Sequence, residues 1–243
     1  MNQLTRLEEF KKVLNNYHVS DDARKLLAQL KLVLLVGPSS SGRNTIVNQL
    51  VKSDHYHSII SDTTRQPRSN NGVMEENGLE YWFRAESDVL HDIQSGEFLE
   101  AAIIHEQQVS GISMRELREA ASANKIAINE IEVAGADNIY EAKPDTLFIF
   151  VLPPSFNEWM ARMQNRGSLP ETEVQRRLQS AVDELTIALD RDYYTFVVND
   201  TFMDTAKTID DLATGVTKQT AEQQTYGRNV ARQLLADTTN HLS

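Results

Sequence analysis

The sequence contains no cysteine among its 243 residues. Disulfide bonds, thiolate metal sites and cysteine nucleophiles are therefore excluded, and a cytoplasmic location is favoured. Long apolar runs are missing as well, so we expect no membrane-spanning segment. The N-terminus, MNQLTRLEEFKKVL, is charged and amphipathic, and it has no apolar stretch of the kind found in signal peptides.

Positive charge is scarce, because 24 lysine and arginine residues face 35 acidic residues and the net charge is −11. A general nucleic-acid-binding role needs a broad basic surface and is therefore disfavoured. Any phosphate site in this chain has to be a local basic island. The hydrophobic fraction of 40% is sufficient for a real core, and the length suits one large α/β domain or one domain with small insertions.

Strand-length apolar runs alternate with helical patterns through most of the chain. The apolar runs occupy residues 32–36, 58–60, 126–131, 146–152 and 194–198, and the helical patterns occupy residues 4–16, 20–30, 44–52, 112–123, 155–165, 171–190 and 204–214. This alternation predicts an α/β fold with a parallel sheet flanked by helices. Residues 61–113 interrupt it with polar, turn-rich sequence and are predicted to form an inserted subdomain.

The segment from Gly37 to Thr45, GPSSSGRNT, lies between an apolar strand run and a helical pattern. In that context the glycines let backbone N–H groups turn inward, and the helix N-terminus adds positive potential for phosphate. The segment resembles the P-loop, G-x-x-x-x-G-K-[ST]. The predicted ATP contacts are Gly37, Ser39, Ser40, Ser41, Gly42, Arg43, Asn44 and Thr45. The alternative is a glycine-rich turn without a ligand.

Two positions of this loop differ from the P-loop pattern, since Arg43 replaces the lysine and Asn44 replaces the serine or threonine. Arginine is a wider planar fork than the compact lysine ammonium, so we expect Arg43 to bind phosphate in another geometry. Asn44 offers Mg²⁺ a neutral amide oxygen instead of a hydroxyl. Thr45 lies about 100° further around the helix.

A second anion-binding pattern follows in the segment SDTTRQPR, from Ser61 to Arg68. Arg65 and Arg68 are three residues apart in a polar loop, and the arginine fork matches phosphate oxygens. Taken alone, the segment favours a solvated basic turn.

Several further segments occur in an order that resembles the guanylate kinase family across residues 32–215. After the P-loop and S-x-T-T-R-x-P-R, the matching segments are Glu75, Gly78–Phe83 (GLEYWF), Gly96–Glu100 (GEFLE), Arg162–Gly167 with Arg177, and Val198–Asp200 (VND). The resemblance implies a P-loop kinase fold with an inserted GMP-binding subdomain and an arginine-bearing lid. It implies GMP and ATP as substrates, with Mg²⁺ accompanying ATP.

The resemblance also implies a role for each matching residue. Ser61 and Glu100 would contact guanine, and a carboxylate suits this base because it accepts from N1–H and the exocyclic amine together. The GMP phosphate would be held by Arg65, Arg68 and Tyr81, with Glu75 orienting the arginines. Further candidates are Ser113 and Glu130 for GMP, Asn199 for ATP, and Asn44 and Glu132 for Mg²⁺.

Three of the arginines in the predicted lid, which spans about residues 155–185, match the family pattern. Arg162 and Arg166 are four residues apart and share a helix face, and Arg177 follows the turn at 167–170. Together with Arg43 they are the expected catalytic residues, because phosphoryl transfer needs positive charge on the phosphoryl oxygens and exclusion of water. The alternative is a solvated charged face, in which these arginines pair with Glu171, Glu173 and Asp183.

Two other segments depart from the family pattern. The segment from Glu106 to Ser113 (EQQVSGIS) lacks the aromatic pair of G-x-Y-Y-G-[ST]. In the segment NEIE, Glu130 and Glu132 keep both charges of L-D-[IV]-D on one side of a strand, but each reaches about one methylene further.

Because the changes fall at phosphate-handling positions, two hypotheses remain. The chain either phosphorylates GMP to GDP with ATP, or it is a catalytically weak or inactive module that senses nucleotide or binds protein. A related kinase of another phosphorylated sugar or nucleotide is disfavoured by Glu100 with Ser61.

The expected organisation has three parts. Residues 1–30 form an N-terminal helical extension, residues 31–215 form the guanylate-kinase-like domain with its insertion at about 61–113, and residues 216–243 form a helical or flexible tail with a weak apolar stripe. Both extensions lie outside the resemblance. They are candidates for contacts with a protein partner or with a second copy in a homodimer.

Overall fold

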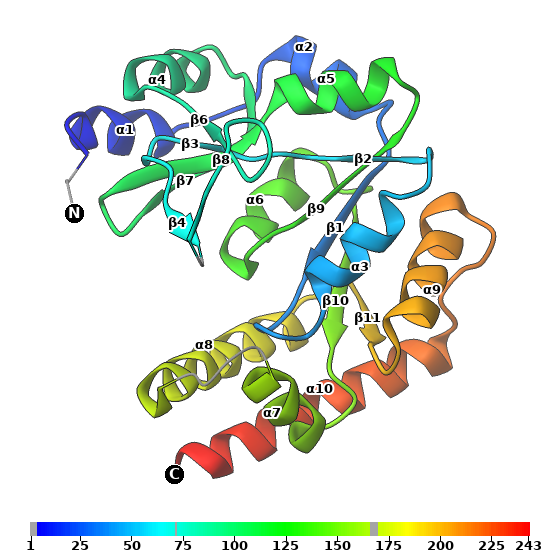
Figure 1. Cartoon of the computed structure of the whole chain (residues 1–243). Coiled ribbons are helices and arrows are strands. Elements are labelled where there is room, and N and C mark those ends of the chain that lie inside the picture. Colours follow the sequence, from blue (N-terminus) through cyan, green and yellow to red (C-terminus); the bar gives the residue numbers. More distant parts are fainter. Residues whose placement is uncertain (1–3, 71, 166–169) are drawn as a thin grey trace. The chain divides into compact units, whose positions relative to one another are not determined.

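The computed structural model describes residues 4–70, 72–165 and 170–243 (Figure 1). The chain divides into two compact units. The first unit contains the chain up to Lys31 together with His57–Ala127 and Asp137–Asp145, and the second contains Leu32–Tyr56, Ile128–Ala136 and the chain from Thr146 onward. In the described ranges, every helix is too short or too polar to cross a membrane.

The second unit is built on a parallel sheet. The strands of this sheet, in spatial order, are β11 (Tyr194–Val198), β10 (Leu147–Leu152), β1 (Leu32–Val36), β9 (Ile126–Glu130) and β2 (Tyr56–Ser58). β11, β10 and β1 lie wholly in the second unit, whereas β9 begins and β2 ends in the first. β1 runs parallel to β10, and β10 runs parallel to β11. All five residues of β1 are buried, as expected of a strand that is covered on both faces. The predicted parallel sheet is confirmed.

Five helices belong to this unit: α3 (Arg43–Leu50), α7 (Phe156–Asn165), α8 (Glu171–Leu189), α9 (Phe202–Thr214) and α10 (Ala221–Leu242). α10, drawn in red in Figure 1, packs against α8 and β11. It begins with a capping box between Thr220 and Gln223. The polar tail predicted from the sequence is therefore mostly one continuous helix.

Side chains from the tail cover the free edge of β11. The Gln224 amide accepts from the Phe196 N–H at 3.1 Å and donates to the Tyr194 carbonyl at 2.7 Å. Gln219 donates to the Phe196 carbonyl at 2.8 Å. These amides replace the missing neighbouring strand, so the edge is closed to pairing with another chain.

The first unit contains a four-stranded sheet. Its strands, in spatial order, are β6 (Trp82–Phe83), β3 (Asp62–Thr63), β8 (Gln108–Ser113) and β7 (Phe98–Ile104), and a separate pair consists of β4 (Ser69–Asn70) and β5 (Val73–Met74). Four helices lie wholly in the unit: α1 (Leu7–Leu14), α2 (Asp21–Leu27), α4 (Glu86–Gln94) and α5 (Met114–Ser122). A further helix, α6 (Val133–Ala142), ends in it. The sequence patterns did not predict α4 or α6.

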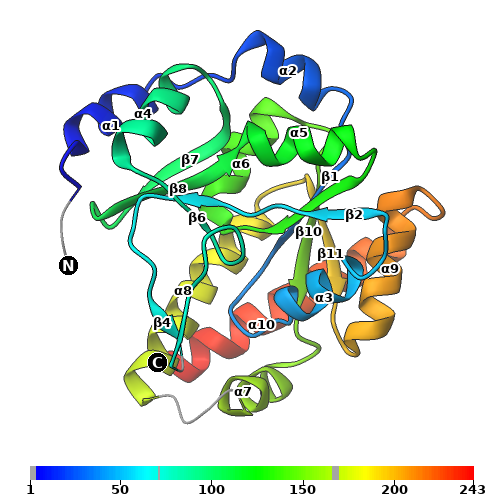
Figure 2. The ribbon, with the colours of Figure 1, turned by 45° about the horizontal axis from the view of Figure 1, so that its top comes forward.

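The N-terminal segment is fixed to β7, the edge strand of this sheet. Figure 2 shows α1 and α4 beside each other near β7, and Phe10 joins Ile93 and Phe98 in one buried cluster. The Tyr17 hydroxyl accepts from the Phe98 N–H at 2.9 Å and donates to the Phe98 carbonyl. Ser20 caps α2 as predicted, because its hydroxyl accepts from the Ala23 N–H at 3.2 Å. The extension is therefore a structural part of the first unit.

Candidate functional site

The loop after β1 has the backbone of a phosphate cradle. Gly37 and Gly42 have φ values of +139° and +101°, and a Cβ atom at Gly37 would lie 2.4 Å from the Val151 carbonyl oxygen. Gly42 is the N-cap of α3, so the loop ends at a helix N-terminus. The hydroxyls of Ser40 and Ser41 are buried and lack hydrogen-bond partners within the described ranges. Such donors fit a bound phosphate.

Side chains from α7 and from the end of β11 support this loop. The Asn199 amide donates to the Ser41 carbonyl at 2.7 Å, and the Trp159 indole donates to the Ser39 carbonyl at 2.8 Å. Thr205 in turn donates to the Asn199 amide oxygen at 3.1 Å. Asn199, an expected ATP contact, is thus fixed on the loop backbone. Trp159 was not predicted, since an aromatic residue on a helical stripe normally indicates core packing.

Arg43 and Asn44 are held by the end of β9 and by their own helix. The Arg43 guanidinium donates to the Ile131 carbonyl at 2.9 Å, and its Nε lies 3.8 Å from a Glu130 oxygen. The Asn44 amide donates to Glu130 at 3.3 Å and accepts from Asn48 at 2.9 Å. The two residues that depart from the P-loop pattern therefore bond to the protein itself. Thr45, the remaining loop candidate, is exposed.

The surroundings of Arg43 are acidic. Glu184 on α8 has one buried carboxyl oxygen without a hydrogen-bond partner among the described residues. Burial and the negative charge of Glu132 raise the pKa of Glu184 to about 7, while the charge of Arg43 acts in the opposite direction. Arg43 therefore offsets an excess of negative charge at this end of the sheet.

No cluster of three histidine, aspartate or glutamate side chains in the described ranges is arranged to hold a metal ion. An Mg²⁺ ion that arrives with ATP needs only one or two carboxylates beside phosphate oxygens and water. Glu130, the last residue of β9, and Glu132, two residues further on, fit this mode. The Asn44 amide oxygen fits less well, because it accepts a hydrogen bond from Asn48.

Two of the three predicted lid arginines lie next to the phosphate loop. Arg162 donates to the carbonyls of Asn199 and Asp200 at 2.9 and 3.1 Å. Arg177 donates to the Ser39 hydroxyl at 3.3 Å and to Glu173 at 2.7 Å. Arg166 lies outside the described residues.

Part of the charged-face alternative is also present. The neighbouring guanidinium groups of Arg176 and Arg177 lower the pKa of Glu173 to about 2. Arg177 therefore has one partner on its own helix and one in the loop. A phosphate in the loop would need to replace only the Ser39 contact.

In the first unit, Glu75 holds two arginine residues, Arg65 by its side chain and Arg68 by its backbone N–H. Arg65 donates to both oxygens of Glu75 at 2.5 and 2.8 Å, and the two side chains are only 11% and 7% exposed. The Arg65 guanidinium also stacks on the Tyr81 ring, 4.7 Å from its centroid. Glu75 accepts the Arg68 N–H at 2.8 Å, and its pKa is lowered to about 2, chiefly by Arg65. The geometry suits a phosphate monoester.

Glu100 lies on β7 opposite Ile112. It has no hydrogen-bond or ion-pair partner among the described residues, and burial raises its pKa to about 7. Ser61 is anchored through its carbonyl, which accepts the Trp82 N–H at 2.9 Å. Ser113, the expected hydroxyl for the base, is buried and donates to Asp62 at 3.1 Å. Its contact with a base stays a prediction.

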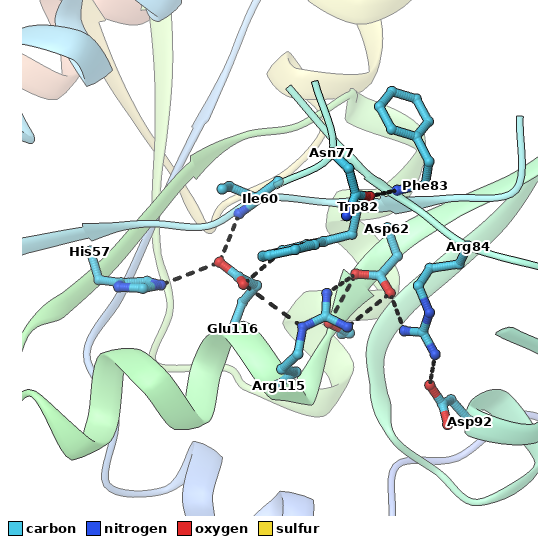
Figure 3. A network of polar contacts seen from close by, with 11 residues as sticks. His57, Ile60, Asp62, Asn77, Trp82, Phe83, Arg84, Asp92, Arg115 and Glu116 are labelled. Carbon is cyan, nitrogen blue, oxygen red and sulfur yellow. Dashed lines mark hydrogen bonds and ion pairs between the residues drawn. The ribbon is translucent and has the colours of Figure 1, made fainter. Parts of the chain in front are cut away.

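A polar network that the sequence did not reveal surrounds Asp62 (Figure 3). This carboxylate is 1% exposed and accepts from Arg115 at 2.6 Å, Arg84 at 2.8 Å and Ser113 at 3.1 Å. Burial raises its pKa, and the two arginines oppose this effect. The network fixes β3, the short strand that lies between Ser61 and Arg65.

The same network continues through Glu116 and Trp82. Glu116 accepts from the Trp82 indole at 2.9 Å, from the Ile60 N–H at 3.1 Å, and contacts the His57 ring at 3.3 Å (Figure 3). The Arg115 guanidinium lies 4.8 Å from the Trp82 ring centroid. The GLEYWF segment could have indicated Trp82, but no local signal indicates the charged partners.

Known proteins resemble this chain over most of its length. Residues 29–215 match the guanylate kinase family. A guanylate kinase of Clostridioides difficile is 35% identical over 182 residues, which cover 74% of this chain and 85% of the relative. A guanylate kinase of Nostoc sp. is 38% identical over 178 residues, which cover 71% of this chain and 83% of the relative.

A solved structure agrees in fold. The crystal structure of guanylate kinase from Anaplasma phagocytophilum matches with a TM-score of 0.55 at 24% identity, covering 79% of this chain and 87% of that chain. The phosphate loop after β1, the parallel sheet and these relatives lead to one conclusion. The chain belongs to the guanylate kinase family and has its P-loop kinase fold.

Proposed function

We propose that this chain transfers the γ-phosphoryl group of ATP to GMP. The observation that carries the proposal is the arrangement of Arg65, Glu75 and Tyr81, together with the Arg68 backbone, because it prepares two arginines for a phosphate monoester. An oxygen of the GMP phosphate would attack the γ-phosphorus, and the bond from that phosphorus to the ADP oxygen would break. The attacking oxygen is already ionised at neutral pH, so no general base is needed.

The remaining residues have supporting roles in this proposal. The loop amides, Arg43, Arg162 and Arg177 balance charge on the transferring group. Mg²⁺, bound with ATP, would supply further charge neutralisation near Glu130 and Glu132. Glu100 would select guanine, since its carboxylate accepts from two neighbouring N–H groups of that base and adenine offers no such pair.

A second candidate is a nucleotide-sensing or protein-binding module with little transfer activity. The specific observation in its favour is that Arg43 and Asn44 bond to Ile131, Glu130 and Asn48. If these bonds persist when ATP binds, the loop lacks its cation at the phosphates.

The two candidates separate in a coupled ADP-release assay with GMP, dGMP, AMP and UMP, run beside calorimetric GMP titrations. We expect turnover with GMP and, more weakly, with dGMP. GMP binding without turnover of any substrate would contradict the proposed phosphoryl transfer and support the sensing module.

A further inference from the structure

A cavity of about 450 Å³ lies beside Glu100 at the edge of the first unit's sheet. Part of its wall is the N-terminal segment, which contributes Tyr17, His18 and Arg24, and the end of α6 contributes Asn138 and Glu141. Residues 17–24 lie outside the range 29–215 that matches the family. This part of the wall therefore lies outside the matched range.

Glu100 gives the cavity a carboxyl group that is available to a ligand. The residue is half-buried, and among the described residues nothing donates a hydrogen bond to it. A carboxylate in such a place is stabilised when a ligand brings N–H donors.

Arg24 supplies the opposite charge to the same cavity. It lies on α2, its side chain is 57% exposed, and its ion pair with Asp21 is long at 3.8 Å. Such exposed pairs contribute little, so the guanidinium can exchange partners. Within the described ranges no ion pair joins Arg24 to Glu100, although both line the cavity. A ligand with donors on one edge and acceptors on the next would bridge the gap.

The sheet indicates which part of a nucleotide reaches this cavity. β8 separates β7, which carries Glu100, from β3, which leads to Arg65. Two strand spacings amount to about 10 Å across the sheet. Ser110 pairs with both Ala102 and Thr63, so Arg65 and Glu100 are also offset along the strands. A nucleoside monophosphate with its phosphate at Arg65 would therefore run diagonally across the sheet to bring its base to β7.

We propose that Arg24 is a specificity-determining residue, which donates to O6 and N7 of the guanine whose N1–H and amine groups bind Glu100. This inference rests on the proposed function. Arginine is well matched to these two acceptors because its fork donates to both at once. The Ser113 hydroxyl already donates its hydrogen bond to Asp62, so it does not donate to guanine O6 at the same time. O6 can therefore accept from another donor.

The test compares GMP with 7-deaza-GMP, which lacks the N7 acceptor, in the full chain and in Arg24→Ala. We expect 7-deaza-GMP to bind about 10-fold more weakly than GMP to the parent protein, and Arg24→Ala to weaken GMP by a similar factor. In Arg24→Ala the two ligands should bind equally. Inosine monophosphate, which lacks the amine read by Glu100, should keep its penalty in both proteins. The measurements are KM with ATP in excess and, independently of turnover, the calorimetric Kd.

Two further variants control for charge and folding. Lys25→Ala removes the neighbouring, 75% exposed side chain outside the cavity and should leave GMP binding unchanged. Arg24→Lys keeps the charge but loses the fork, so it should not restore discrimination against 7-deaza-GMP. If Arg24→Ala still discriminates against 7-deaza-GMP as the parent does, the inference is wrong while GMP phosphorylation stands. If the parent neither binds nor phosphorylates GMP, both fail.

Discussion

Replacing Glu100 by glutamine should stabilise the protein above neutral pH and weaken its binding of GMP. Burial raises the pKa of Glu100 from 4.5 to about 7, so the folded protein holds this proton more tightly than the unfolded chain does. The free energy of unfolding should therefore fall as pH rises from about 4.5 to about 7, and then stay level. Each tenfold difference in proton affinity is worth about 1.4 kcal/mol, which gives a ceiling of about 3 kcal/mol.

Glutamine keeps the shape of glutamate without the ionisation. Because Glu100 is only half-buried, the penalty for its charge is smaller than this ceiling, and we expect Glu100→Gln to gain about 1 to 3 kcal/mol at pH 8 and almost nothing at pH 5. The same change replaces one acceptor oxygen by a donor that faces the guanine N–H groups. The KM for GMP should rise by about 10-fold or more. An unmatched buried polar group costs about 1 to 3 kcal/mol, and about 1.4 kcal/mol corresponds to a tenfold change in affinity.

Urea denaturation without nucleotide, followed by circular dichroism at pH 5 and pH 8, measures the first effect, and initial rates against GMP measure the second. Glu119→Gln is a suitable control, because Glu119 is exposed on α5. If Glu100→Gln is less stable than the parent at pH 8, or if the difference is the same at both pH values, the carboxyl is ionised and satisfied in the folded protein, and the reasoning is wrong.

Three other variants test the remaining contacts. Glu75→Ala removes the partner that orients Arg65, so initial-rate kinetics should show KM for GMP rising about 10- to 100-fold with KM for ATP unchanged. An unchanged KM for GMP would show that Glu75 does not prepare Arg65 for the phosphate of GMP. The double change Arg43→Lys with Asn44→Ser loses the bonds to Ile131 and Glu130, and we expect kcat to rise about tenfold, whereas a fall would show that the native loop is adapted to these partners. Gln224→Ala exposes the edge of β11 and should cost about 1 to 3 kcal/mol in urea denaturation, with more dimer on size-exclusion chromatography; unchanged stability would refute the role of this amide.

The sequence predicted β1, β9, β10 and β11 well, because unbroken apolar runs such as Leu32–Val36 have one simple structural explanation. It placed the remaining strand of that sheet at 58–60, whereas β2 is Tyr56–Ser58. It gave the tail only as helical or flexible with a weak apolar stripe, whereas α10 is one helix whose buried residues are Gly227, Ala231, Leu234 and Thr238. Small and polar residues make this stripe weak in a hydrophobicity pattern. Gly227 is needed there, since a Cβ atom would lie 2.6 Å from Cβ of Phe196. α4 was missed because its apolar residues are few and its segment reads as part of a polar insertion.

Candidate site residues could be proposed from the sequence where a local motif contains them. The P-loop and the SDTTRQPR segment contain Ser40, Ser41 and Arg65 in fixed spacing, and the structure describes each in a setting suited to phosphate. The partners of Asp62 come from segments up to 53 residues away, so no local pattern links them. The bonds of Arg43 to β9 could not be predicted either, because they depend on how two distant strands lie in the sheet.

The proposed phosphoryl transfer can be followed directly with γ-labelled ATP, Mg²⁺ and GMP in a single turnover, with the products separated by chromatography. We expect the label to appear in GDP faster than in inorganic phosphate. Without GMP, we expect the label to stay in ATP. Label that stays in ATP despite bound GMP, or that is released only as inorganic phosphate, would contradict the claim that this chain phosphorylates GMP.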